Sequence, residues 1–210
     1  MTGTAAVIVA HPDDETLWCA GTMLMHPEMH WTVLSMCRRS DPDRAPKFSR
    51  AIQLLHAVGI MADLDDGPEQ EPLPDELVQN NLFNCLPDHE YELGITHSPY
   101  GEYTRHRRHE EIGRAVMLLW QQGKLAFKEL WMFAYEDGNK EYLPRPRRNA
   151  QKIETLQRNI WMKKYQIITE VYGFSSDSFE ARTTPKEEAF WRFTERSELM
   201  DWYRRGGGGK

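Results

Sequence analysis

The stretch "AAVIVAHPDDET", residues 5–16, joins a short apolar run to a cluster of polar side chains. The run of Ala, Val and Ile predicts a strand that is buried on both faces, as in a parallel sheet. A histidine, two aspartates and a glutamate follow at the point where this strand stops. Ligands of open α/β sheets bind at the carboxyl ends of the strands, so these residues are candidates for chemistry.

Strand-like and helix-like patterns alternate along the chain as far as residue 135. We expect further strands at 31–37, at 91–101 with a loop at its end, and at 130–135, with helices at 15–27, 46–60, 75–86 and 108–123. In the helix at 46–60, Phe48, Ile52, Leu55 and Val58 share one face, and Gly59 is the expected stop. The alternation predicts an α/β fold, a Rossmann-like three-layer sandwich with a mostly parallel sheet and its site at the carboxyl ends of the strands.

The pattern changes after residue 143. We expect a loop, then a long helix over 152–174, and a late strand or turn over 183–193. We see no internal domain boundary, so the sequence predicts one domain over residues 1–205. The end "GGGGK", residues 206–210, is typical of a flexible tail or an expression remnant.

Composition narrows the class of protein. The 210 residues carry a formal net charge of −6, which argues against general binding to nucleic acid or to a membrane surface. The three cysteines, Cys19, Cys37 and Cys85, form no CxxC pair, which argues against a disulfide framework and fits a reducing cytoplasm. No apolar stretch has the length of a membrane span, and no signal-peptide pattern opens the chain.

The first polar cluster has the residue types of a metal site. His11, Asp13 and Asp14 lie within four positions where a strand gives way to a helix, and imidazole and carboxylate groups are good zinc ligands. The start of a helix also favours carboxylates. The alternative is that Asp13 or Asp14 caps the helix and that His11 is an ordinary loop residue.

A second cluster supplies more ligand types. In "GEYTRHRRHEEIG", residues 101–113, His106 and His109 are three apart, so one helical turn places both on the same side. Alone, two histidines among arginines are ordinary surface residues. Both clusters follow strands that open on the same edge of the sheet, however, and three ligands with one open position are typical of catalytic zinc. Other divalent ions accept the same ligands.

At this point the sequence resembles a known family. "AHPDDE", residues 10–15, is similar to the first signature of the PIG-L / LmbE-like zinc-dependent N-deacetylases, and "THSPYGEYTRHRRHEEIG", residues 96–113, is similar to the second. The late "EAFWRF", residues 188–193, resembles the closing segment of the family. The similarity runs over about residues 5 to 195. Arg107 and Arg108 stand where the family usually has Pro and Asp, which removes a carboxylate that could orient a histidine.

The resemblance implies a role for each matching position. His11, Asp14 and His109 correspond to the zinc ligands, Asp13 to the general base, and His106 to the histidine that stabilises the transition state or protonates the leaving group. The implied activity is a zinc-dependent hydrolase that removes an acetyl or other N-acyl group from an amino sugar or a related amide. Asp13 is free for a base's role because it cannot easily share the metal with its neighbour Asp14.

Several side chains are candidates for binding substrate. Arg38 follows the second strand, His97 follows the strand at 91–96, and Arg108 lies within the second motif. Guanidinium groups near the site could receive a phosphate or carboxylate of an anionic N-acetylated sugar or glycoconjugate. The alternative is that these arginines pair with nearby aspartates and glutamates. The sequence leaves the oligomeric state open, a homo-oligomer included.

Two other functions remain open from the sequence. A metal-dependent phosphoesterase would more naturally use two bridged metals and needs more ligands than we find. A catalytically degenerate module that binds a sugar or nucleotide would fit the change at Arg108. No GxGxxG pattern opens the first helix, which argues against dinucleotide binding, and a binding module has no use for the base Asp13.

Overall fold

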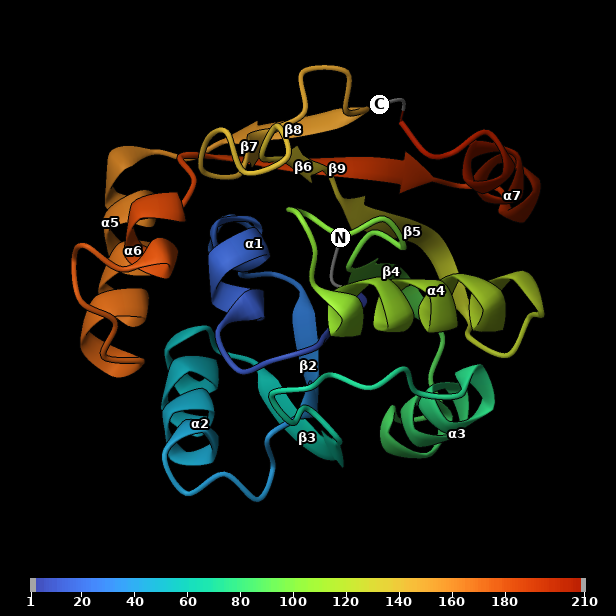
Figure 1. Ribbon diagram of the computed structural model, residues 1–210, viewed down its shortest axis with the longest axis horizontal. Coiled ribbons are helices and arrows are strands. Elements are labelled where there is room, and N and C mark those ends of the chain that lie inside the picture. The colour runs from blue at the N-terminus through green and yellow to red at the C-terminus, as the bar shows by residue number, and fades with distance from the viewer. Residues whose placement is uncertain (1–2, 209–210) are drawn as a thin grey trace.

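The computed structural model describes residues 3–208, whose centre is one mixed sheet of seven strands (Figure 1). The strand order is β3-β2-β1-β4-β5-β9-β8. Strands β1 to β5 are parallel to one another, and β9 pairs antiparallel with both β5 and β8. The bounds are β1 Thr4–Val9, β2 His30–Cys37, β3 Val58–Leu64, β4 Tyr91–Thr96, β5 Phe127–Phe133, β8 Lys152–Thr155 and β9 Glu187–Phe193, with a separate pair β6 Tyr135–Glu136 and β7 Arg145–Pro146.

Helices cover both faces of this sheet (Figure 1). Successive residues of β1 point to opposite faces: Val7 and Val9 pack in the core under α1, α2 and α5, and Ala6 and Ile8 pack in the core under α3, α4 and α7. The three-layer α/β prediction is confirmed. The bounds are α1 Asp14–Met25, α2 Arg44–Leu54, α3 Asp75–Cys85, α4 Arg107–Gln121, α5 Arg158–Gln166, α6 Phe179–Thr183 and α7 Arg196–Arg204, with a π-helical turn at Ile167–Val171.

The strand order creates a crevice at the carboxyl ends of the neighbouring strands β1 and β4. The chain moves outward from β1 to β2 and β3, then returns to β4 on the other side of β1. At such a reversal the connections leave in opposite directions, which creates a crevice outside the carboxyl ends of the two central strands. Val9 ends β1 and Thr96 ends β4, so both polar clusters start at this crevice.

Two predicted helices differ from the structure. The helix expected over 46–60 ends at Leu54, and Val58 and Gly59 belong to the edge strand β3. Val58 is 62% exposed there, and Gly59 lies against Phe48, where a Cβ would approach that ring to 3.0 Å. The helix-like spacing of apolar residues in α2 happens to continue into β3. Because β3 is an edge strand and only part of it is buried, its own sequence does not show the continuous apolar run that would mark a strand.

The segment expected as a helix over 152–174 begins as a strand. Residues Lys152–Thr155 pair antiparallel with β9, and only then does α5 start at Arg158. The late strand at 183–193 is confirmed as β9, whereas α6 and α7 were not anticipated. Gly209 and Lys210 of the predicted tail lie outside the described residues, and the oxygen of Gly208 accepts a hydrogen bond from Asn149 Nδ2 at 2.8 Å. The single domain over 1–205 stays a prediction.

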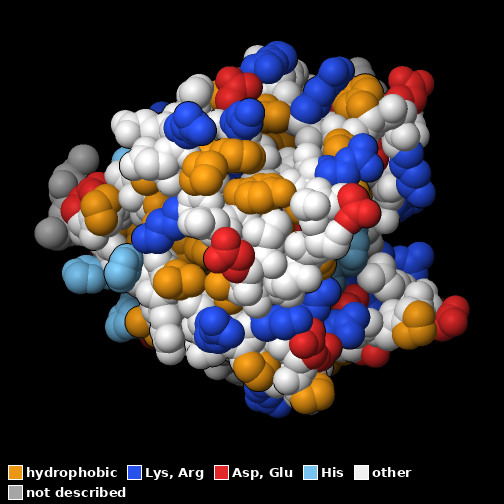
Figure 2. All heavy atoms as spheres, turned by 90° about the vertical axis from the view of Figure 1, so that its left-hand side faces the viewer, with side chains coloured by type: hydrophobic (Ala, Val, Ile, Leu, Met, Phe, Trp, Pro, Cys, Tyr) orange, Lys and Arg blue, Asp and Glu red, His pale blue; other side chains and the backbone are white. Residues whose placement is uncertain are grey.

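The outer surface over α2, α5 and α6 mixes apolar and charged side chains (Figure 2). Met162 of α5 and Phe179 of α6 are among its large exposed hydrophobic residues, at 41% and 37%. A hollow at the right-hand edge of that view shows histidine side chains between basic ones. Within residues 3–208, no helix has the length and apolar character needed to cross a bilayer.

Candidate active site

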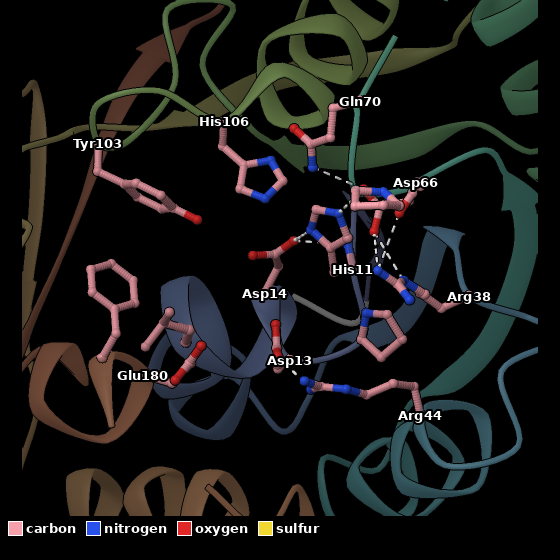
Figure 3. Close-up of a pocket in the computed structure, with 15 residues that line it drawn as sticks. His11, Asp13, Asp14, Arg38, Arg44, Asp66, Gln70, Tyr103, His106 and Glu180 are labelled. Carbon is pink, nitrogen blue, oxygen red and sulfur yellow. Dashed lines mark hydrogen bonds and ion pairs between the residues drawn. The ribbon is translucent and has the colours of Figure 1, made fainter. Parts of the chain in front are cut away.

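The link between β1 and α1 builds the first half of the site. Helix α1 begins at Asp14, whose Oδ2 accepts a hydrogen bond from the backbone N–H of His11 at 2.8 Å. The preceding residue, Asp13, has a φ of 118°, a backbone conformation that non-glycine residues rarely adopt. Strain of this kind costs on the order of 1–3 kcal/mol and concentrates at functional sites. It turns the carboxylate of Asp13 into the crevice (Figure 3).

Helix α4 supplies the second half. His109 lies in its first turn and is 1% exposed, and His106 is the residue that precedes the helix. The rings of His106 and His109 stack with 4.2 Å between centroids. Both therefore face the end of β1, as the spacing of the second cluster predicts.

Three ligand atoms of the two halves form a nearly regular triangle. His11 Nδ1 is 3.2 Å from Asp14 Oδ2, and His109 Nε2 is 3.3 Å from each of these two atoms. A tetrahedral zinc ion about 2.0–2.1 Å from its ligands requires edges of about 3.3–3.4 Å between them. The distances among the predicted ligands His11, Asp14 and His109 thus fit a tetrahedral divalent ion that keeps one position open.

The carboxylate of Asp14 is both ionised and held in a fixed orientation, as a metal ligand requires. Burial raises its pKa, but the imidazole of His109 opposes that effect, and the pKa of Asp14 lies well below its ordinary value. Its second oxygen, Oδ1, accepts a hydrogen bond from Trp18 Nε1 at 3.2 Å, which fixes the plane of the carboxylate. Asp14 is therefore ionised, with one oxygen directed at His11 and His109.

His97 also approaches this triangle, with Nε2 3.5 Å from Asp14 Oδ2. Burial lowers its pKa, but Glu102 and Asp14 raise it, to about 9. A protonated ring would put a proton on Nε2, yet that atom accepts the backbone N–H of Ala10 at 3.0 Å. The hydrogen bond assigns the neutral ring with its proton on Nδ1, and it removes His97 from the ligand set. The side chain is 0% exposed, so the expectation that His97 contacts substrate is wrong.

Asp13 lies beside the triangle and is held by Arg44. Arg44 Nη1 donates a hydrogen bond to Asp13 Oδ2 at 2.9 Å, and Glu15 Oε2 accepts one from the backbone N–H of Asp13 at 3.0 Å. Burial and the charge of Asp14 raise the pKa of Asp13 well above its ordinary value, against the opposing effect of Arg44. A carboxyl group with a raised pKa is a better proton acceptor than an ordinary aspartate.

His106 is neutral in this setting. Burial lowers its pKa to about 3, and His109 and His11 act in the same direction. Among residues 3–208, its Nδ1 is one of four buried side-chain atoms with no hydrogen-bond partner. The family usually has an aspartate at position 108 that could orient a histidine, and this sequence has an arginine there. The missing carboxylate is consistent with the lack of a partner for His106 Nδ1.

Arg108 points away from the crevice. Its side chain is 0% exposed, and its nitrogens donate to Glu111 Oε2 at 2.6 Å and to the backbone oxygens of Asp65 and Glu71 at 2.5 and 2.9 Å. It anchors the loop after β3 to helix α4. The expectation that Arg108 contacts substrate is therefore wrong.

Arg38 does reach the crevice, but it is paired. Its Nη2 and Nε donate to Asp66 Oδ2 at 2.7 and 2.9 Å, and Asp66 Oδ1 lies 3.2 Å from His11 Nε2. Asp66 thus lies behind the candidate ligand His11 as a carboxylate partner, and Arg38 holds Asp66 in place. The sequence analysis left open that these arginines pair with nearby aspartates and glutamates instead of binding substrate. The contacts of Arg38 and Arg108 agree with that alternative.

The crevice opens into a cavity of about 480 Å³ (Figure 3). Tyr103 and Phe179 make an aromatic corner with 5.2 Å between ring centroids, and the carboxylate of Glu180 points into the same space. The lining residues are His11, Pro12, Asp13, Asp14, Leu17, Arg38, Arg44, Asp66, Gly67, Pro68, Gln70, Tyr103, His106, Phe179 and Glu180.

Sequence reasoning missed several of these residues. Asp66 follows β3, so the rule that strand ends meet at one edge would have found it had β3 been recognised. Phe179 and Glu180 come from α6, far along the chain, and no pattern in the sequence connects that helix to the crevice.

Solved structures with the same fold are numerous. The N,N'-diacetylchitobiose deacetylase from Pyrococcus horikoshii superposes with a TM-score of 0.67 at 13% identity, covering 91% of this chain and 84% of that one. The zinc-inhibited form of the teicoplanin deacetylase Orf2 superposes with a TM-score of 0.63 at 11% identity, covering 90% and 97%. This chain has the fold of the LmbE/PIG-L-type deacetylases.

The LmbE/PIG-L fold alone does not decide the reaction. GalB, the 4-carboxy-2-hydroxymuconate hydratase from Pseudomonas putida KT2440, also superposes, with a TM-score of 0.58 at 14% identity over 90% of this chain and 95% of that one. Among curated proteins, uncharacterized protein L374 of Acanthamoeba polyphaga mimivirus is 25% identical over 126 residues, which cover 52% of this chain and about half, 55%, of that protein. No family model matches the sequence. The side chains of the site, not the fold, decide the activity.

Proposed function

We propose that this protein is a metal-dependent hydrolase that removes an acetyl or other N-acyl group from an N-acetylated amino sugar or a related amide, with zinc as the metal. The observation that carries the proposal is the ligand triangle of His11, Asp14 and His109 with Asp13 directly beside it. A divalent ion at such a site polarises a carbonyl oxygen and makes a bound water acidic near neutral pH.

The side chains divide the proton transfers between them. Asp13, oriented by Arg44, accepts a proton from the attacking water as the carbon–oxygen bond forms. Neutral His106 donates one N–H to the substrate on the other side of the reacting carbon. When the carbon–nitrogen bond breaks, the proton held on Asp13 passes to the leaving nitrogen, so the products are a carboxylate and an amine.

The cavity supports a sugar-sized substrate. Its volume of about 480 Å³ lies within the usual ~300–1,000 Å³ of small-molecule sites. The corner of Tyr103 and Phe179 offers an apolar wall for a ring face, and Glu180 offers an acceptor for hydroxyl groups. Arg38 and Arg44 are already paired with Asp66 and Asp13, so the lining favours an uncharged sugar over the anionic one considered from the sequence.

Metal content in wild type and in His109→Ala, both purified without chelators, is the first test. We expect about one zinc per wild-type chain and none in the variant, followed by acetate release from N-acetylated sugars by wild type alone. Absence of metal from both proteins, even after zinc is offered, would contradict the proposal and favour the degenerate binding module. Normal folding of the variant is checked by circular dichroism.

The other readings have weaker support. Within residues 3–208, the two groups of metal-ligating side chains share His109 and belong to one cluster, which gives no separate second site for a two-metal phosphoesterase. A module that only binds a ligand needs no proton acceptor, so it does not explain why Asp13 is held in a strained conformation by Arg44. Release of inorganic phosphate, or water addition without acetate release, would identify a phosphoesterase or a hydratase.

We also propose that the protein is cytoplasmic. Cys19, Cys37 and Cys85 are all free thiols, and two of them are buried, which supports the reducing cytoplasm. A homo-oligomer stays a prediction, to be checked by light scattering.

A further inference from the structure

One buried carboxylate touches the metal-ligand triangle from behind. Glu102 lies in the loop after β4 and is 1% exposed. Its Oε2 is 2.7 Å from Nδ1 of His109 and 3.1 Å from Nδ1 of His97. Its Oε1 accepts the backbone N–H of Ser98 at 2.9 Å, which fixes the orientation of the carboxylate.

The protons of this network can be assigned from its partners. His97 Nε2 accepts the N–H of Ala10, so the proton of the neutral His97 ring is on Nδ1 and is donated to Glu102. Glu102 Oε2 is an acceptor, so His109 also carries its proton on Nδ1. That tautomer leaves the lone pair of His109 Nε2 directed at His11 and Asp14, as a metal ligand requires.

We propose that Glu102 is the positioning residue of the metal site, with His97 as its support, and that its contact with Nδ1 of His109 keeps Nε2 of that ring available to a metal. The chain of hydrogen bonds runs from Ala10 at the end of β1 through His97 and Glu102 to His109 on α4. It therefore ties together the two strands and the helix that carry the ligands. The inference builds on the proposed function only in assuming that His109 binds a metal.

Zinc affinity of Glu102→Gln tests this role without any substrate. The change keeps the size of the side chain but removes its charge and one acceptor. Loss of such a partner typically weakens metal binding 10- to 100-fold, so we expect the zinc dissociation constant to rise by about that factor in competition with a chromophoric chelator. An affinity within about twofold of wild type, in a folded variant, would overturn the proposal.

Glu111→Gln is the matched control. Glu111 is also buried, accepts the backbone N–H of Leu73 at 3.1 Å and pairs with Arg108, but it contacts no member of the triangle. We expect this variant to lose stability and to keep its zinc affinity within about twofold. Equal weakening in both variants would show a general effect of losing a buried charge and would overturn the specific role of Glu102.

The histidine tautomers test the network in the unmutated protein, which keeps the proposal open to refutation if Glu102→Gln does not fold. Long-range proton–nitrogen NMR spectra distinguish a proton on Nδ1 from one on Nε2. We expect Nδ1 protonation for His97 and His109, with and without zinc. Protonation of His109 on Nε2 would overturn the proposal. A wild type that binds no divalent ion would instead refute the proposed function, while the metal-free spectra still decide the network.

Discussion

At the scale of single residues, Asp13 departs from the ordinary in both backbone and side chain. Because asparagine tolerates a positive φ better than most residues, Asp13→Asn keeps the backbone and removes only the proton acceptor. We expect deacetylation to fall by about 10²- to 10⁴-fold, the usual contribution of a general base, with metal content unchanged. Acetate release and elemental analysis measure the two effects.

Asp43→Asn is the control for this prediction. Asp43 is an exposed acid of the next loop that pairs with Lys47 and lies outside the cavity lining, so its removal should leave turnover unchanged. Turnover of Asp13→Asn within about threefold of wild type would remove the base from the mechanism.

The residue scale also shows how far the sequence alone could go. That His11, Asp14 and His109 lie close together could be predicted, because both polar clusters follow strands that end at one edge of the sheet. Arg108 was misjudged because neighbours on a helix point about 100° apart, so a residue beside His109 in sequence leaves the face that His109 presents to the crevice. Glu102 could not be predicted, because its contacts depend on the path of a loop.

At the scale of elements, a close approach of α4 to the end of β4 sets the distance between the two halves of the site. A Cβ on Gly113 would lie 2.5 Å from the backbone oxygen of His97 and 2.7 Å from the carbonyl carbon of Ser98. Neither backbone atom can yield without moving the loop. Gly113→Ala should therefore shift α4 outward, lower the melting temperature and weaken zinc binding by at least tenfold.

Gly94→Ala separates the loss of stability from the loss of metal. A Cβ there would meet the ring of Phe127 at 2.5 Å, in the body of the sheet and away from the ligands. We expect a comparable fall in melting temperature with zinc affinity retained, by calorimetry and chelator competition. Unchanged zinc affinity in Gly113→Ala would show that the spacing of α4 does not set the site.

Helices and strands could be predicted from the sequence where the hydrophobic pattern was compatible with only one kind of secondary structure. Helices α1, α3 and α4 and the parallel strands β1, β2, β4 and β5 followed from the change of hydrophobic period, whereas the parallel edge strand β3 did not. The errors at 46–60 and 152–174 both arose where a strand on or near the edge of the sheet adjoins a helix, because such a strand shows neither a continuous apolar run nor clean alternation. The pairing of β8 with β9 depends on residues more than 30 positions apart, which local patterns cannot reveal.

At the scale of the whole molecule, the ligand triangle joins segments that are 98 positions apart, from His11 to His109. An ion that binds only the folded chain stabilises it by an amount set by its concentration relative to Kd, about 2.7 kcal/mol at a hundredfold excess. For a chain of about 200 residues this corresponds to a rise in Tm of about 5–10 °C. We expect that rise when zinc is added to chelator-treated wild type.

The same measurement on two variants shows whether the effect comes from this site. His109→Ala should lose the zinc-dependent rise, because one corner of the triangle is gone. His106→Ala should keep it, because His106 lies beside the triangle and is assigned to the substrate. A rise that persists in His109→Ala would place the zinc elsewhere on the molecule. Loss of the rise in His106→Ala would instead make His106 a ligand and move the donor of the N–H to another residue of the cavity wall.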